Sequence, residues 1–132
     1  MQEPRVWIVS AEHWPRALLR AELIERGFDA VGFENLSDAI GELVLPWSRP
    51  PALAVIDFHE QSVEEKLLER LRAAKIPIMA IVDSTRSIDE AIRRFGWTAW
   101  LRRPVSVGAI ADTVARLTGA ERHTAATGVA PR

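Results

Sequence analysis

The 132-residue chain contains no cysteine, which excludes disulfide bonds, a thiol nucleophile and a cysteine-ligated metal. It also has no apolar run approaching the roughly 20 residues that a membrane-spanning helix requires. A formal net charge of -1 provides no general attraction to nucleic acid or to an anionic membrane. Neither a GxGxxG nor a Walker A pattern occurs, so we expect no dinucleotide cofactor and no nucleotide hydrolysis. We therefore expect a cytoplasmic protein that by itself binds neither nucleic acid nor membrane.

The composition that remains is that of an ordinary folded domain. Hydrophobic residues make up 48% of the chain and charged residues 27%, which is typical of a soluble globular protein. The length suits one domain with its own core. From residue 120 onward the sequence is small, polar and without period. We therefore expect one domain over residues 1–119, followed over 120–132 by a disordered tail or the stub of a linker.

Short apolar runs alternate with longer segments of helical period up to residue 118. This alternation predicts a parallel β-sheet with helices on both faces. The predicted strands are Arg5 to Ser10, Asp29 to Phe33, Ala52 to Asp57, Ile76 to Val82 and Thr98 to Leu101.

Five helical segments follow these strands. We expect them from about Trp14 or Pro15 to Gly27, after Ser37, after a capping box of Ser62 with Glu65, after a second capping box of Ser87 with Glu90, and from Val107 to Gly119. In the first helix, the apolar residues expected to share the buried side are Ala17, Leu19, Ala21, Leu23 and Ile24.

Right-handed crossovers and short connections favour a flavodoxin-like three-layer sandwich with strand order 2-1-3-4-5. In such a sheet, ligands bind beyond the carboxyl ends of the strands, where the strand order reverses. Asp57 comes at the end of the apolar run "LAVI", so it is expected at this crevice. The remaining residues expected there are Ser10, Ala11, Glu12, Asp83, Ser84 and Arg103.

The order and spacing of several short segments carry a family resemblance. These segments are "VWIVSAE", "LIERGF", "LAVIDF", "IPIMAIV" and "GWTAWLRRP". Together they resemble the receiver domains of bacterial two-component response regulators, over about residues 4–118. The resemblance implies a phosphorelay function in which Asp57 occupies the phospho-acceptor position. It also implies a cis peptide bond before Pro104, since an X-Pro bond permits the cis form at small cost.

The sequence departs from that family where a metal would bind. Ser10 and Ala11 stand where the resemblance implies acids that hold Mg²⁺, and Val82 stands where it implies a hydroxyl residue. Arg103 replaces the lysine that the resemblance implies. Glu12 lies one position beyond the expected acids, and Mg²⁺ tolerates such a displacement poorly. We therefore expect no resident metal or cofactor, and a degenerate (pseudo-receiver) domain.

The remaining charged groups predict an acidic pocket of Glu12, Asp57 and Asp83 facing Arg103. We expect Arg103 to neutralise Asp57, Asp83 or both, because a guanidinium can bridge two carboxylates. A simpler interpretation makes Asp57 a turn acid and Asp83 a loop residue that bonds to its own backbone. The histidines, at positions 13, 59 and 123, are scattered, and we expect each to be exposed and none to join a metal cluster.

A candidate interaction surface lies on the fifth predicted strand and the helices beside it. Trp97, Trp100 and Arg102 cluster there, and Trp and Arg are enriched at binding hot spots. At least one of the two tryptophans is expected to belong to the core instead. This face of the fourth and fifth helices and the fifth strand would bind a protein partner or a second copy of the chain.

The leading hypothesis is a non-enzymatic, receiver-like signalling module that recognises a protein partner without being phosphorylated. The alternative is a phospho-accepting receiver that uses Asp57 with Mg²⁺ held by Glu12. A third hypothesis is a structural dimerisation unit that uses the face of Trp97 and Trp100.

Overall fold

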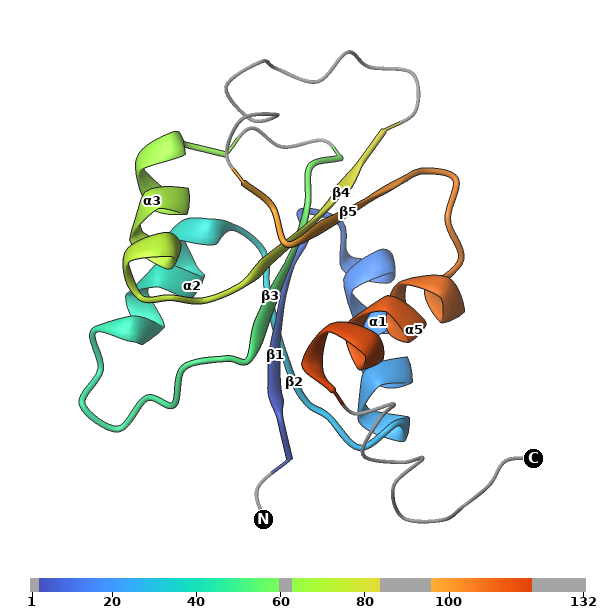
Figure 1. Ribbon diagram of the computed structural model, residues 1–132, viewed down its shortest axis with the longest axis horizontal. Coiled ribbons are helices and arrows are strands. Elements are labelled where there is room, and N and C mark those ends of the chain that lie inside the picture. The colour runs from blue at the N-terminus through green and yellow to red at the C-terminus, as the bar shows by residue number, and fades with distance from the viewer. Residues whose placement is uncertain (1–2, 60–62, 84–95, 120–132) are drawn as a thin grey trace.

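Five short strands form one parallel sheet in the order β2-β1-β3-β4-β5 in the computed structural model, which describes residues 3–59, 63–83 and 96–119 (Figure 1). The strands are β1 Arg5–Val9, β2 Asp29–Phe33, β3 Leu53–Asp57, β4 Ile78–Val82 and β5 Ala99–Arg102. The helices are α1 His13–Glu25, α2 Leu36–Leu43, α3 Glu65–Ala73 and α5 Val107–Thr118. This order confirms the predicted flavodoxin-like α/β fold.

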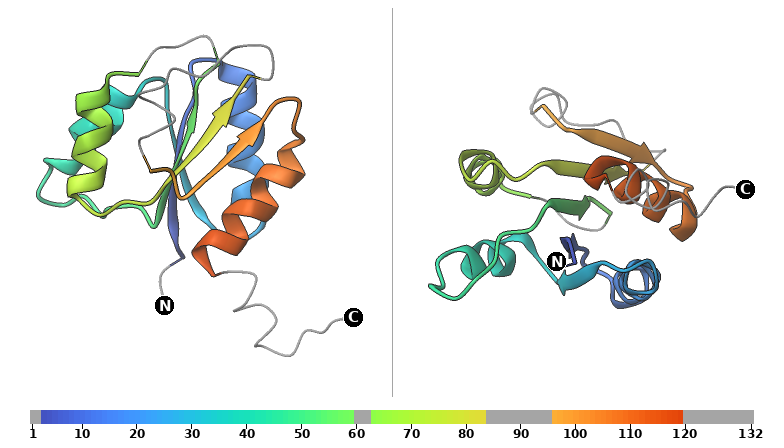
Figure 2. Two further views of the ribbon diagram at one scale, coloured as in Figure 1. Left: turned by 45° about the horizontal axis from the view of Figure 1, so that its top comes forward. Right: turned by 60° about the horizontal axis from the view of Figure 1, so that its bottom comes forward.

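The domain has three layers: the sheet lies in the middle, with α2 and α3 on one face and α1 and α5 on the other (Figure 2). Every residue of β3 and β4 is buried, as expected for central strands covered on both sides. Alternate side chains of the strands enter two core clusters. Val6 and Ile8 of β1 pack in the cluster with α1 and α5, whereas Trp7 and Val9 pack in the cluster with α2 and α3.

Several predicted boundaries differ from the structure. α2 begins before Ser37, because the Asn35 side chain accepts a hydrogen bond from the Asp38 N–H at 2.9 Å and caps the helix. α3 begins at Glu65 after an N-cap at Glu64, so its start lies further along the chain than the capping box at Ser62 predicts.

The ends of the strands move by a residue or two, as element boundaries commonly do. Ser10 lies outside β1, although its N–H still bonds to the Phe33 carbonyl. β4 begins at Ile78, because Ile76 closes the turn after α3 through a bond to the Leu71 carbonyl. The predicted capping residue Ser62 and the helix predicted after Ser87 lie outside the described residues, as does the tail from residue 120.

The buried side of α1 is narrower than its apolar pattern predicts. Leu19 and Leu23 are buried, but Ala21 is exposed and 46% of Ile24 is accessible to solvent. The expectation that Ile24 is a core residue was therefore wrong. α1 covers β1 and β2 at the edge of the sheet, so residues on its outer flank have no further element against which to pack.

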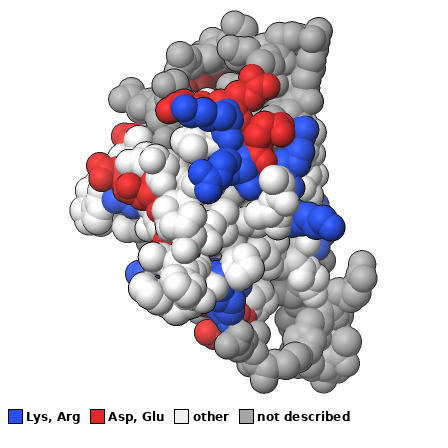
Figure 3. Space-filling model, turned by 90° about the vertical axis from the view of Figure 1, so that its left-hand side faces the viewer, with Lys and Arg blue, Asp and Glu red and all other residues white. Residues whose placement is uncertain are grey.

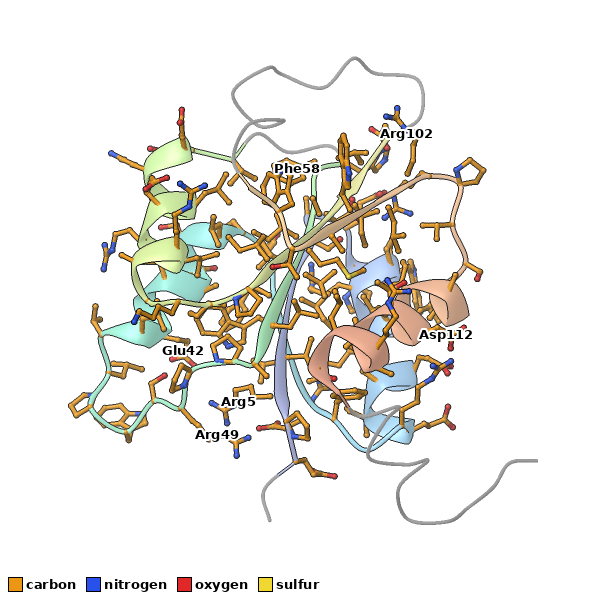
Figure 4. The ribbon with its side chains drawn as sticks, viewed as in Figure 1. Arg5, Glu42, Arg49, Phe58, Arg102 and Asp112 are labelled. Carbon is orange, nitrogen blue, oxygen red and sulfur yellow. The ribbon has the colours of Figure 1, made fainter. Side chains whose placement is uncertain are left out.

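An ion-pair network lies at the end of the sheet opposite the carboxyl ends of the strands, where Arg5 and Arg49 lie close together (Figure 4). Asp29 Oδ2 accepts from Arg5 Nε at 2.9 Å and from Arg49 Nη2 at 2.7 Å. The hydrogen bond from Arg5 is the main reason that the pKa of Asp29 is lowered, and the charges of both arginines act in the same direction. The network ties β1 and β2 to the segment that precedes β3.

The face formed by α2 and α3 carries its charged side chains mainly in its upper part, at the level of α3, with an uncharged region below (Figure 3). Val44 and Trp47, in the loop after α2, are 67% and 78% exposed. Within the described ranges, no helix has the length and the apolar character needed to cross a membrane.

Candidate functional site

The carboxyl ends of β1, β3, β4 and β5 meet at the top of the sheet (Figure 1). Asp57 is the last residue of β3 and lies beside Ile81 of β4 in the parallel register. Only 5% of Asp57 is accessible to solvent, which makes it the one charged residue that is buried within the described ranges. A buried carboxylate is costly unless it is paired and hydrogen-bonded. Its partners therefore decide what this site can do.

Both carboxylate oxygens of Asp57 have partners within the chain. Oδ1 accepts a hydrogen bond from the backbone N–H of His59 at 3.0 Å. Oδ2 forms a close ion pair with Nη2 of Arg103, which directly follows β5. The first bond closes a local turn that aspartate side chains commonly form with the backbone N–H two residues later. The second joins β3 to β5 across β4, so the acid is held by its own turn and by a distant cation.

The side chain of His59 links the other two acids of the pocket. Its Nε2 lies 3.2 Å from Oε1 of Glu12, and its Nδ1 lies 3.1 Å from Oδ1 of Asp83. A neutral imidazole has one N–H, whereas an imidazolium donates from both nitrogens. Only the charged form can therefore donate to both carboxylates at once. When the ring is protonated, its single positive charge lies between two acids that would otherwise repel each other.

The structure brings together the acids that the sequence placed in one pocket, but it divides them into two sets. Arg103 contacts Asp57, while Asp83 is contacted by His59. His59, which was expected to be exposed, is half-buried, and its side chain contacts both Glu12 and Asp83. Its position two residues after a strand-end aspartate is the one sequence signal that could have indicated this role.

The substituted positions give the pocket no further carboxylate. Ser10 is buried, and its carbonyl accepts from Arg16 at 2.7 Å. Ala11 is half-buried, and Val82 is buried at the end of β4. Among the described residues no group of three His, Asp or Glu side chains is arranged to hold a metal ion. The donor set does not suit Mg²⁺, because Mg²⁺ requires near-octahedral oxygen ligation and these oxygens contact an arginine and a histidine.

A small cavity of about 50 Å³ lies behind Asp57 and Arg103, between the sheet and helices α1 and α5. Its wall includes Ser10, while Ile8, Val55 and Ile81 form an apolar floor. Charges over an apolar floor are poorly screened, so their mutual attraction is stronger than it would be at the surface. This environment strengthens the ion pair between Asp57 and Arg103.

The predicted interaction surface separates into a packed part and an exposed part. Trp97 is half-buried, and its ring meets that of Phe58 edge-on with centroids 5.5 Å apart. Trp100 on β5 is 42% exposed, with the guanidinium of Arg102 6.0 Å from its ring centroid. Phe58 and Arg102 lie at the upper end of the sheet in Figure 4. The Arg103–Pro104 peptide bond that follows is cis.

Comparison with known proteins identifies the fold. A response regulator receiver protein from Burkholderia phymatum superposes with a TM-score of 0.73 at 21% identity, covering 89% of this chain and 96% of that one. The chain has the receiver fold. A response regulator receiver protein from Pseudomonas putida superposes with a TM-score of 0.72 at 24% identity, covering 88% of this chain and 98% of that one.

A further receiver fold belongs to a signal transduction histidine kinase from Syntrophus aciditrophicus. Its signal receiver domain superposes with a TM-score of 0.71 at 19% identity, covering 89% of this chain and 91% of that one. Neither a protein-family model nor a curated protein sequence matches this chain. The receiver fold is thus established by shape, while the pocket has to be interpreted from its own residues.

Proposed function

We propose that this chain is a receiver-like signalling domain of a bacterial two-component pathway that acts by protein recognition without phosphorylation. The observation that carries the proposal is the pairing of buried Asp57 with Arg103. A phosphoryl acceptor needs an accessible carboxylate oxygen and positive charge directed at the incoming phosphoryl group. Here one oxygen of Asp57 is bound by Arg103 and the other by the N–H of His59.

The other acids of the pocket support the same proposal. Glu12, the acid that follows β1 in the sequence and could replace the absent metal ligands, is engaged by His59. Asp83 adds a negative charge near the position that a phosphoryl group would occupy, and no hydroxyl is available at Val82. Each feature opposes an incoming anion. We therefore propose a domain with no resident divalent cation and no catalytic activity. We also propose that the domain is cytoplasmic.

Incubation with acetyl phosphate and Mg²⁺, read out by intact mass, tests the proposal. We expect no phosphoryl adduct on the wild-type chain, while a phosphorylatable receiver treated in parallel gains one. Beryllofluoride should likewise leave the thermal unfolding temperature unchanged. An adduct that Asp57→Asn abolishes would instead support the alternative, in which Asp57 accepts phosphate and Glu12 holds Mg²⁺. Glu12→Gln would then lower the yield of the adduct.

The proposed recognition surface is the outward side of β5. Of the two helices predicted to share it, α5 packs against the opposite face of the strand and the fourth lies outside the described residues. Trp100 and Arg102 alternate with Ala99 and Leu101, which pack against the core cluster of α1 and α5. The outward pair therefore lies on the opposite face of the strand. We propose that it contacts a protein partner or a second copy of the chain.

Sedimentation of the wild type and of Trp100→Ala separates these two partners. A dimer that Trp100→Ala dissociates would support the third hypothesis, dimerisation through this face. A monomer in both cases would leave a different protein as the partner.

A further inference from the structure

A groove runs along the outer side of α1, beside the edge strand β2. It has a volume of about 470 Å³ and is lined by His13, Arg16, Ala17, Arg20, Ala21, Ile24 and Gly32. We call it the basic groove, because no Asp or Glu is among these residues. None of the charged residues of the acidic pocket line it.

The two arginines of the basic groove are held in place by the backbone and not by acids. Arg16 Nη1 donates to the Ser10 carbonyl at 2.7 Å, and Arg20 Nε donates to the Ala30 carbonyl at 3.0 Å. Within the described ranges, neither guanidinium forms an ion pair with a carboxylate. Other arginines of the chain do so: Arg5, Arg26, Arg49 and Arg103 each contact an Asp or Glu. The groove therefore has positive charge that is held in position and that no carboxylate of the described residues pairs with.

The shape of the groove depends on Gly32. A Cβ at this position would lie 3.1 Å from both Cγ and Cδ of Arg16, so the stem of Arg16 lies directly over the backbone of β2. Arg20 covers the Ala30 carbonyl on the same strand. Charged side chains over an edge strand hinder its pairing with another strand. The groove is thus suited to binding through side-chain charges and not to extending the sheet.

The spacing of the groove residues determines which sequence pattern a bound peptide would need. Arg16, Arg20 and Ile24 follow one another at four-residue intervals, which is about 6 Å of helix rise per step. In an extended peptide, alternate residues are separated by about 6.6 Å and point to the same side. Two acids at alternate positions would therefore face Arg16 and Arg20, and an apolar residue at the next alternate position would face the exposed Ile24.

We propose that the basic groove binds an extended acidic segment of a partner protein with the pattern acidic-x-acidic-x-apolar, in either chain direction. Bidentate pairing of the guanidinium forks with carboxylates supplies the specificity. Ala17 and Ala21 leave room for the peptide backbone, and His13 offers a further donor at one end. This partner site shares no residue with the β5 surface.

Isothermal titration calorimetry with the synthetic peptides GETETLG and GLTETEG tests the proposal. We expect one of them to bind with a salt-dependent affinity that is lost in GQTQTLG or GLTQTQG and weakened in GEETTLG, whose acids are adjacent. Arg16→Gln and Arg20→Gln should each weaken binding about tenfold, the loss of one charge-assisted contact. Arg116→Gln on α5 is the matched control and should leave the affinity unchanged.

Two further variants keep the test independent of folding. Gly32→Ala changes no charge but displaces the stem of Arg16, so it should weaken binding while circular dichroism shows a folded chain. Arg20→Lys keeps the charge and should retain part of the affinity. Binding that is unaffected in the Arg16→Gln, Arg20→Gln double variant would overturn the proposal. So would the absence of peptide binding at about 1 mM, or saturable binding of inorganic phosphate without binding of either peptide.

Discussion

Replacement of Arg103 by methionine should destabilise this domain more than replacement of Asp57 by asparagine. The two residues differ in exposure: Asp57 is buried, whereas 27% of the Arg103 side chain is accessible to solvent. When Arg103 is removed, the charge of Asp57 stays buried with fewer partners. When Asp57 is neutralised, the guanidinium can turn toward water.

The magnitude follows from that asymmetry. Breaking a fully buried ion pair by removing one partner costs about 3–5 kcal/mol. Because Arg103 is partly solvated, we reduce this to about 2 kcal/mol for Arg103→Met. For Asp57→Asn we expect about 1 kcal/mol, the scale of a lost hydrogen bond. The destabilisation of the double variant should be about 1.5 kcal/mol smaller than the sum of the two single destabilisations, because the double variant leaves neither charge unpaired.

Urea unfolding followed by circular dichroism at 222 nm measures these quantities. In thermal unfolding, Arg103→Met should lower the Tm by about 8 °C. The neighbouring Arg102→Met is the matched control and should stay within about 0.5 kcal/mol of the wild type, as surface substitutions usually do. If Arg103→Met costs no more than this control, or if the coupling energy is close to zero, Arg103 does not neutralise Asp57 and the proposed function loses its main support.

Three further substitutions test other parts of the structure. Leu23→Ala, in a fully buried position of α1, should cost about 2–5 kcal/mol in urea unfolding; a cost below 1 kcal/mol would mean that α1 packs elsewhere. Asn35→Ala should cost about 1 kcal/mol through loss of the cap of α2, whereas Asn35→Asp should restore it. The lowered pKa of Asp29 means that its stabilisation is present above the unfolded-state value near 4 and is lost as pH falls through the folded-state value. Asp29→Asn should therefore cost about 1 kcal/mol or less at pH 7, and this cost should fall as the pH is lowered below about 4; a cost that stays the same on acidification would contradict this.

The fold could be predicted because its signals are local and repeated. β3 and β4 read as unbroken apolar runs, and burial on both faces is the physical reason for such runs. Each helix shows its own apolar period and its own stop, such as Gly119 with a φ of 81° after α5. Position in the sheet then limits which side of each element is covered, and this is where the prediction for Ile24 failed. The pattern on α1 could not indicate that its outer flank borders an edge strand.

The candidate site was predictable in its members but not in its pairing. Strand ends supply Asp57, Asp83 and Arg103 to one crevice, so the sequence order alone brings them together. Which cation contacts which acid depends on how separate loops approach one another over a few ångströms. His59 was missed for this reason, since its two carboxylate partners are far away in the sequence and only the folded chain places them on either side of the ring.

The contact between Phe58 and Trp97 has a practical consequence. Phe58 follows Asp57 directly, and its ring touches the indole of Trp97 with a centroid separation of 5.5 Å. Indole emission responds to the groups around the ring, so a rearrangement at Asp57 would be transmitted to a natural chromophore through one backbone residue and one ring contact. The chain thus contains its own optical reporter of the acidic pocket, and events there could be followed in real time without a dye.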